Sequence, residues 1–231
     1  MGIATEASIF VDSKDQIKFT VIKVRNLSGR TRSLSATGYV EWVLGALRPS
    51  TVMHVVTEHD AELGALLTRN PYNTEFVNRV AFFDANNARF NFTTDRNEFI
   101  GRNGTLEDPE AMKHTRLSGN HGAGLDPCSA IQVPFILNNG QEREIIFRMG
   151  SGKNINEVHR MITRFNGKDA AANSLANVKS FWRNTLSQAI IKTPDPSVNI
   201  LANGWLQYQV ISCRLWGTKR LLSIRWCIRI P

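Results

Sequence analysis

Apolar and polar residues alternate along most of the first two thirds of the chain, which is the pattern of half-buried β-strands. The alternation is clearest in residues 17–25, IKFTVIKVR, and it resumes in residues 32–42. The opening residues, MGIATEASIF, also have the composition of a strand. The pattern predicts further strands at 53–57, 65–69, 78–83, 88–93, 130–137 and 142–149.

Turn-forming residues separate these strands. Residues 26–30, NLSGR, predict a turn that joins the first two long strands into a hairpin. Asn138-Asn139-Gly140 predicts a second hairpin, between 130–137 and 142–149, because an Asn-Gly pair accommodates positive φ. Many short strands separated by turns favour an antiparallel β-sandwich.

Residues 94–127, TDRNEFIGRNGTLEDPEAMKHTRLSGNHGAGLDP, interrupt the strand pattern and are rich in Gly, Asn and charged residues. This segment is longer than an ordinary loop, and long ordered loops on a β scaffold are often functional. Its scattered glycines indicate a backbone that needs positive φ, not a phosphate-binding loop.

Helical spacing takes over after Gly150. Asn154 and Glu157 are placed to start a helix whose apolar stripe is Ile155, Val158, Met161 and Ile162. A second helix is predicted at about 169–189. Strands followed by helices indicate two domains in series, and not a βαβ repeat.

A rigid turn, Thr193-Pro194-Asp195-Pro196, precedes the last predicted helix, with Ser197 as its N-cap. The apolar residues of this helix recur at helical spacing, so we expect it to pack into a core. They are Val198, Leu201, Trp205, Tyr208 and Leu215.

The composition is that of a globular protein, with 231 residues of which 42% are hydrophobic. The net charge of +8 suggests nucleic-acid binding, but half of it lies in residues 218–231 and no basic cluster with interleaved aromatics occurs elsewhere. We therefore expect no nucleic-acid partner. No apolar run is long enough to span a membrane. Three distant cysteines and the absence of a signal-peptide pattern predict a cytoplasmic protein with reduced thiols.

Titratable residues form no recognisable catalytic constellation. His114, His121 and Cys128 lack the spacing of a zinc site, so we expect no metal. The acidic residues of the long segment are expected to be solvated. The best functional candidates are Arg96, Asn97, Phe99 and Arg102.

Four stretches resemble glycoside hydrolase family 94, formerly glycosyltransferase family 36, which holds the cellobiose- and chitobiose-phosphorylase-like enzymes. They are DRNEFIGRNGTLEDPEAM, GLDPCSAIQVPF, EREIIFRMGSG and KTPDPSVNILANGWLQYQVISCRLWG. The early stretches KVRNLSGRTRSLSATGYVEWVLG and VVTEHDAELGALLTRNPYN look closest to the C-terminal region of cyclic β-1,2-glucan synthases.

The resemblance implies a mainly β, then α, fold. It predicts a partial antiparallel β-supersandwich of the galactose-mutarotase-like type in residues 1–150 and a helical linker in 151–192. The first helix of an (α/α)6 barrel would follow in 193–217.

The resemblance also implies inverting phosphorolysis or transfer of β-glucosyl units, with inorganic phosphate as co-substrate and no cofactor. A single general acid would suffice, because phosphate is the nucleophile. That acid and the phosphate ligands would lie in the barrel beyond residue 217. The partners implied are a β-linked glucan or glucoside and a second subunit in a homodimer. Arg96, Phe99 and Arg102 would contact sugar; the alternative is a segment pinned by Arg96 pairing with a carboxylate.

The tail TKRLLSIRWCIRIP departs from the family, which continues approximately as RSGFYQSGGAFGFRDQLQD. One extra base after the Gly217 codon would generate such a tail from a shifted frame. We therefore expect residues 218–231 to be out of frame and the chain to be a truncated fragment that starts partway through the sandwich. Resequencing the DNA tests this. The fragment is expected to bind carbohydrate without the catalytic residues; the alternatives are an active β-glucoside phosphorylase and a stand-alone carbohydrate-binding module.

Overall fold

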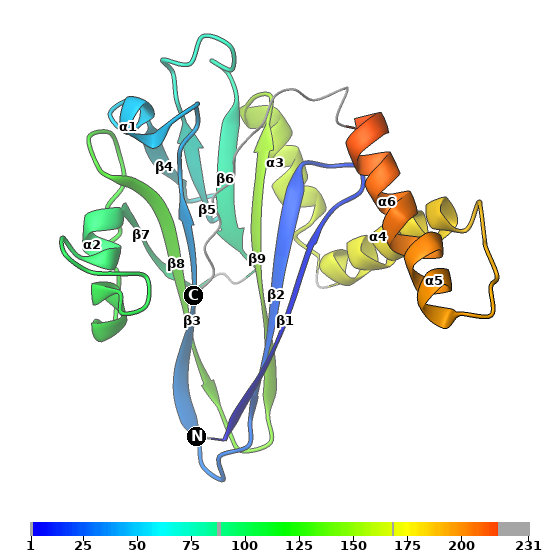
Figure 1. Ribbon diagram of the computed structural model, residues 1–231. Coiled ribbons are helices and arrows are strands. Elements are labelled where there is room, and N and C mark those ends of the chain that lie inside the picture. The colour runs from blue at the N-terminus through cyan, green and yellow to red at the C-terminus, as the bar shows by residue number, and fades with distance from the viewer. Residues whose placement is uncertain (1, 87–88, 168, 217–231) are drawn as a thin grey trace. The chain divides into compact units, whose positions relative to one another are not determined.

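The computed structural model describes residues 2–86, 89–167 and 169–216. These residues form two compact units, with the boundary between Ala171 and Ala172. Strands make up most of unit 1 and helices make up unit 2 (Figure 1). The predicted order, strands first and helices second, is confirmed, and the predicted domain boundaries stay predictions.

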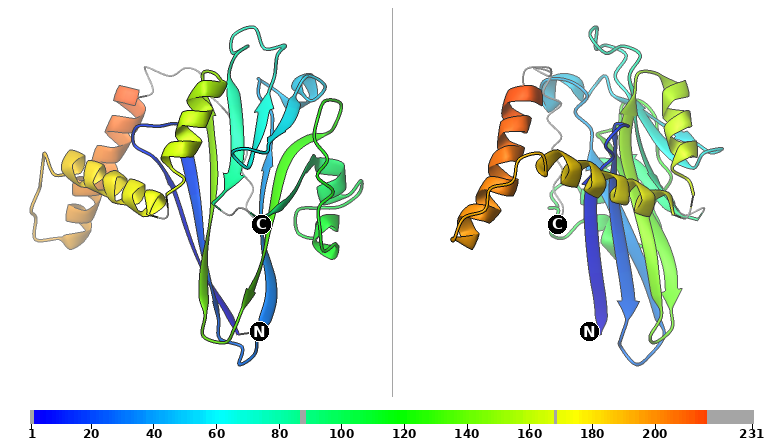
Figure 2. Two further views of the ribbon diagram at one scale, coloured as in Figure 1. Left: turned by 180° about the vertical axis from the view of Figure 1, so that it is seen from behind. Right: turned by 90° about the vertical axis from the view of Figure 1, so that its right-hand side faces the viewer.

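Unit 1 is built from two antiparallel sheets that face each other (Figures 1 and 2). The larger has the strand order β1-β2-β9-β6-β5-β4 and the smaller the order β3-β8-β7. The strands are β1 Ile3–Val11, β2 Ile17–Asn26, β3 Arg32–Glu41, β4 Val56–Asp60, β5 Ala65–Arg69, β6 Val80–Ala85, β7 Asn91–Asp95, β8 Pro127–Leu137 and β9 Glu142–Gly152.

Both predicted hairpins are wrong. β2 pairs with β1 and β9, whereas β3 pairs with β8, so each of the two turns carries the chain from one sheet to the other. Asn26 joins the two crossings: its Nδ2 donates to Arg30 O at 2.7 Å and to Leu137 O at 2.9 Å, and its carbonyl accepts from Gly140 N at 2.7 Å. Gly140 has φ of +82°, as the Asn-Gly pair predicted. The turn residues were therefore read correctly, but turn chemistry does not specify which strands pair.

The strand predicted at 53–57 is also misplaced, since β4 begins only at Val56. The preceding residues form a short helix, α1 (Arg48–Thr51), and a turn in which His54 N donates to Thr51 O at 2.9 Å. The strands predicted at 78–83 and 88–93 lie two to three residues further along, as β6 and β7.

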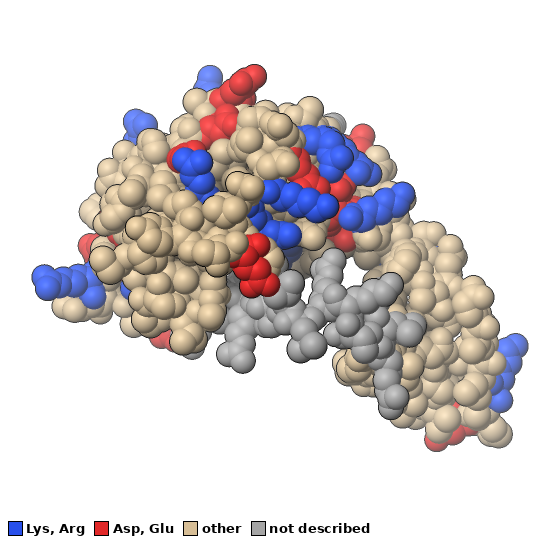
Figure 3. Space-filling model, turned by 90° about the horizontal axis from the view of Figure 1, so that it is seen from above, with Lys and Arg blue, Asp and Glu red and all other residues tan. Residues whose placement is uncertain are grey.

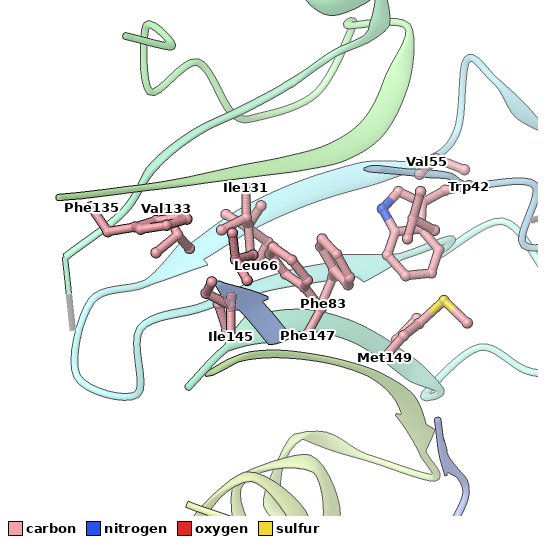
Figure 4. Close-up of a cluster of buried hydrophobic side chains, with 14 of the residues drawn as sticks. Trp42, Val55, Leu66, Phe83, Ile131, Val133, Phe135, Ile145, Phe147 and Met149 are labelled. Carbon is pink, nitrogen blue, oxygen red and sulfur yellow. The ribbon is translucent and has the colours of Figure 1, made fainter. Parts of the chain in front are cut away.

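The main core lies between the two sheets. Side chains from both inner faces point toward one another there, among them Ile131 and Val133 from β8 and Ile145 and Phe147 from β9 (Figure 4). Gly38 on β3 lets the sheets approach closely, because a Cβ at this position would lie 2.7 Å from the ring of Phe83.

A second core lies on the outer face of the larger sheet, under α3 (Ile155–Arg164). Asn154 caps α3 as predicted, its Oδ1 accepting from Glu157 N at 3.0 Å. Val158, Met161 and Ile162 of the predicted stripe are buried, whereas Ile155 is exposed.

An ion pair is buried between β6, β9 and the end of α3. Arg148 donates to both oxygens of Asp84, at 2.8 and 2.7 Å, and to Phe165 O at 2.5 Å. Arg148 and Asp84 are 2% and 0% exposed. The guanidinium therefore neutralises a buried carboxylate and caps the C-terminus of α3 at the same time.

Unit 2 contains α4 (Ala170–Leu186), most of which lies beyond the unit boundary, and a helical stretch that begins at Asp195. Asp195 is its N-cap and not Ser197 as predicted: Asp195 Oδ1 accepts from Ser197 N at 2.8 Å, and Pro196 occupies the first helical turn. The stretch comprises α5 Pro196–Ile200, a π-helical turn Leu201–Trp205, α6 Leu206–Val210 and a second π-helical turn Ile211–Trp216.

The predicted core packing of this helix is not found in the described residues. Tyr208 contacts Trp182 of α4, with 5.1 Å between ring centroids, but Val198, Leu201 and Trp205 are exposed, Trp205 by 59%. The side chain of Leu215 and the tail 218–231 lie outside the described residues. The assignment of 193–217 to a barrel stays a prediction.

Candidate functional site

The long segment between β7 and β8 lies against the three-stranded sheet, on the face away from the main core (Figure 1). It contains α2 (Arg96–Ile100) and a 3₁₀ turn, η1 (Glu110–Lys113). Five buried apolar residues attach it to the sheet: Phe99, Ile100, Ala111, Leu117 and Ala130. The segment is thus a packed part of unit 1, with its own small core.

Phe99 is an anchor of this segment. Asp95 caps α2 by accepting from Asn97 N at 2.9 Å, and one helical turn later the Phe99 ring stacks on Tyr39 of β3, with centroids 4.6 Å apart. Phe99 is 3% exposed. In this structure its side chain holds α2 on the sheet, and a direct contact between Phe99 and a sugar stays a prediction.

Arg96 belongs to a four-charge network. Its Nε donates to Glu41 Oε1 at 3.0 Å and its Nη1 lies 3.7 Å from Asp126 Oδ2. Arg48 of α1 pairs with Asp126 and lies 3.7 Å from Glu41 Oε2. This matches the alternative reading, in which Arg96 pins the segment by pairing with a carboxylate. A direct contact between Arg96 and a sugar stays a prediction.

Electrostatics in this network favour the ionised carboxylate of Glu41. Partial burial raises its pKa, but hydrogen bonds from Arg96 and Tyr39 and the charge of Arg48 outweigh burial and leave the pKa of Glu41 lowered. Tyr39 Oη donates to Glu41 Oε1 at 2.9 Å. Seen from above, basic and acidic side chains are intermingled on unit 1 (Figure 3), which fits charges held in pairs.

Glu98 joins the start of the segment to residues 118–120. It accepts from Thr93 Oγ1 at 2.6 Å, from Ser118 N at 2.9 Å and from Asn120 Nδ2 at 3.3 Å. Partial burial raises the pKa of Glu98, but these hydrogen bonds together lower it below its ordinary value. The expectation that the acidic residues here are merely solvated is therefore wrong for Glu98.

Arg102 is an exposed cation of the segment, like Lys113 and Arg116. It follows α2, and within the described part of the chain its guanidinium makes no hydrogen bond or ion pair. Gly101 has φ of +90°, and a Cβ on Gly104 would lie 1.9 Å from Ile100 O, so a tight backbone turn presents Arg102 to solvent. Its sugar contact stays a prediction.

His114, His121 and Cys128, which the sequence analysis considered and did not predict as metal ligands, have different surroundings. His114 lies 3.9 Å from Glu110, the His121 ring lies 5.9 Å from Phe92, and Cys128 is buried, which raises the pKa of its thiol well above the usual range. No group of three or more metal-ligating side chains occurs among the described residues.

Sequence comparison identifies the family. The family description "Glycosyl hydrolase 94, supersandwich domain" matches residues 1–168, which is most of the chain. The chain belongs to glycosyl hydrolase family 94. The match confirms the resemblance, the β-supersandwich and membership of a family of carbohydrate-active enzymes.

Relatives of this family 94 chain include the cyclic beta-(1,2)-glucan synthase NdvB of Rhizobium meliloti, which is 32% identical over 86% of this chain and 7% of that protein. The N,N'-diacetylchitobiose phosphorylase of Vibrio furnissii is 23% identical over 94% of this chain and 27% of its own length. The cellobionic acid phosphorylase of Neurospora crassa is 24% identical over 91% and 27%, respectively. The chain thus spans at most 27% of the length of these relatives.

Among the described residues, none of the helices is both long and apolar enough to cross a bilayer.

Acid is expected to release the long segment of the family 94 sandwich. The folded pKa values of Glu41 and Glu98 lie below the unfolded value near 4.5, so their stabilisation is complete above that pH and is lost as the pH falls through the folded values. Hydrogen exchange of residues 94–127 should therefore accelerate below about pH 4.5, after correction for the intrinsic rate, before the core strands open.

Glu98→Gln is the matched variant, because it keeps the side-chain shape and removes the titrating group. We expect fast exchange of residues 94–127 at neutral pH and a weaker acid dependence in this variant. Equal acid profiles for the two proteins would contradict a role for Glu98.

Proposed function

We propose that this chain is the glucan-binding sandwich portion of an enzyme that transfers β-glucosyl units, and that its ligand is a β-linked glucan or glucoside. The family match over residues 1–168 carries the proposal. The relatives named above, a cyclic beta-(1,2)-glucan synthase and disaccharide phosphorylases, support β-linked sugars as the ligand class.

In the complete reaction, inorganic phosphate would be the co-substrate of an inverting phosphorolysis, and no further cofactor would be needed. The described residues fit a binding role better than a catalytic one, because Glu41 and Glu98 are both engaged in holding the segment. We therefore propose that the 231-residue chain binds β-glucan without turning it over, and that a homodimer is its assembled form.

Arg102 is the residue through which the segment would contact sugar. Its exposed guanidinium carries donors that suit hydroxyl oxygens, and Gly101 and Gly104 fix the turn beside it. Arg96 would act mainly by holding α2, because its guanidinium is committed to Glu41 and Asp126.

The test uses the purified chain and two probes, a β-1,2-linked glucose pentamer and cellopentaose, with binding measured by ligand-observed NMR. Arg102→Ala is expected to weaken binding of the preferred probe about tenfold, since hydrogen bonds to charged groups contribute about 1.5–3 kcal/mol.

Arg30→Ala is the control, because Arg30 is an exposed arginine in the turn between β2 and β3. It should leave binding unchanged. If the wild-type chain binds neither probe, the proposed function is wrong. Release of glucose 1-phosphate from sophorose and phosphate would overturn the statement that the chain binds without turnover.

A further inference from the structure

A stacked aromatic pair, a half-buried His54 and an exposed Tyr72, lies on unit 1 outside the long segment. The rings of His54 and Tyr72 stack with centroids 4.2 Å apart and an angle of 22° between their planes. Tyr72 is nevertheless 74% exposed. His54 covers one side of the Tyr72 ring, so the exposed area belongs mainly to its other side and its hydroxyl edge.

The turn that carries Tyr72 is held rigidly by two asparagines. Asn70 is 7% exposed; its Oδ1 accepts from Tyr72 N at 3.1 Å and its Nδ2 donates to Leu44 O at 3.0 Å. Asn73 Oδ1 accepts from Glu75 N and Phe76 N, each at 3.1 Å. These bonds fix the backbone of the turn, and His54 stacks on the Tyr72 ring, so less conformational freedom is lost when a ligand binds.

The carbonyl that accepts the hydrogen bond from Asn70 belongs to Leu44, a residue with a strained backbone. Leu44 has φ of +39°, in the left-handed region that non-glycine residues rarely adopt. Strain of this kind persists only where the surrounding structure enforces it, and it often marks a binding site. Here it orients Leu44 O toward the turn that presents Tyr72.

The aromatic pair is also connected to the long segment, through α1. His54 closes the turn after α1, and Arg48 of α1 pairs with Asp126 and Glu41, the same carboxylates that hold Arg96. In Figure 1, α1 lies next to the loop that joins β5 and β6, where Tyr72 resides. A ligand on Tyr72 would thus sit on the same rigid part of the sandwich as the segment.

We propose that Tyr72, backed by His54, is a stacking platform for one pyranose ring of a β-linked glucan, a contact additional to Arg102. This inference rests on the proposed function. A pyranose has a flat face of C–H groups and a rim of hydroxyls, which suits a flat aromatic face whose neighbours Asn73 and Glu75 are polar. The exposed face of one aromatic ring matches the size of one pyranose ring; because Met53 and Val77 nearby in the sequence are also exposed, a protein interface is the competing outcome of the test.

The test compares Tyr72→Ala with Tyr72→Phe in the whole chain, using the pentamer that the wild type binds better. Tyr72→Ala is expected to weaken binding about tenfold, whereas Tyr72→Phe keeps the ring and should change it less than about twofold. In ligand-observed NMR, sugar C–H signals should lose saturation transfer in Tyr72→Ala. The side chain is exposed, so both variants should keep the wild-type thermal midpoint.

Unchanged binding by Tyr72→Ala would overturn the platform. If Arg102→Ala still weakens binding in the same series, the proposed function survives that failure; if the wild type binds neither pentamer, both proposals fall. A self-associated form that Tyr72→Ala dissociates in sedimentation, with sugar binding intact, would identify the surface as a protein interface and also overturn the platform.

Discussion

Arg148→Ala is expected to lower the free energy of unfolding of unit 1 by about 3–5 kcal/mol, the range for breaking one side of a buried ion pair. The substitution leaves Asp84 fully buried without its counter-ion, and burial raises the pKa of that carboxyl. It also removes the donor to Phe165 O, so α3 loses its C-terminal cap. Urea unfolding followed by circular dichroism measures the change as a lower midpoint.

A surface pair in the same sheet is the control. Lys23 and Glu144 lie 3.9 Å apart with side chains 45% and 42% exposed, and Lys23→Ala should cost less than about 1 kcal/mol. Replacing both buried partners, as Asp84→Leu with Arg148→Met, should recover most of the stability, because no uncompensated charge remains. If Arg148→Ala costs no more than Lys23→Ala, the pair does not stabilise the sandwich.

The alternation of apolar and polar residues predicted the positions of most strands but not which strands pair with each other. Residues 17–25 and 32–42 are strands as predicted, and residues 26–30 do form a turn, yet β2 and β3 lie in different sheets. Local turn chemistry is the same for a hairpin and for a crossing between sheets. Contacts between residues far apart in the sequence distinguish the two, such as the hydrogen bond from Asn26 Nδ2 to the carbonyl of Leu137, and a single sequence does not reveal them.

The long segment was also predicted, and one of the two readings had Arg96 pin it by pairing with a carboxylate, but the residues that pair with Arg96 were not identified. Its length and composition marked it, and its glycines at positive φ were expected. The partners of Arg96 are a strand residue, Glu41, and a residue at the far end of the segment, Asp126. Charge pairs between distant residues have no local sequence pattern, so the sequence did not predict that Glu41 and Arg48 take part. For Glu98 the sequence held a weak sign of a structural role, because it is an acidic residue in the first turn of a capped helix.

The sequence also does not show which aromatic side chains are buried and which are exposed. Phe99 and Tyr72 are both aromatic residues in segments rich in turn formers, yet Phe99 is buried and Tyr72 is exposed. The difference comes from tertiary packing: α2 turns Phe99 onto Tyr39, whereas Asn70 and Asn73 hold the turn that presents Tyr72. The sequence named Phe99 with Arg96 and Arg102 as candidate sugar contacts, and it carries no local signal that separates a buried aromatic side chain from an exposed one.

Trp42→Ala is expected to destabilise unit 1 by about 3–5 kcal/mol, as for other buried aromatic-to-alanine changes. Trp42 is 1% exposed and fills the end of the core between the sheets (Figure 4). Its Nε1 donates to Ser129 Oγ at 2.8 Å, so truncation also leaves a buried hydroxyl without that donor. Trp42→Phe keeps much of the volume and loses the hydrogen bond, and should cost roughly 1–2 kcal/mol in the same urea titration.

The position of Trp42 gives this variant a second effect. It directly follows Glu41, and its backbone carbonyl accepts from Arg48 Nη1 at 3.4 Å, so a shift of the backbone after loss of the buried indole would reach two members of the charge network. Hydrogen exchange in residues 94–127 should therefore be faster in Trp42→Ala than in Trp42→Phe, under conditions where both remain folded. Equal exchange in the two variants would show that the segment is held by its own small core around Phe99, and that the network of Glu41, Arg48 and Arg96 does not transmit the loss.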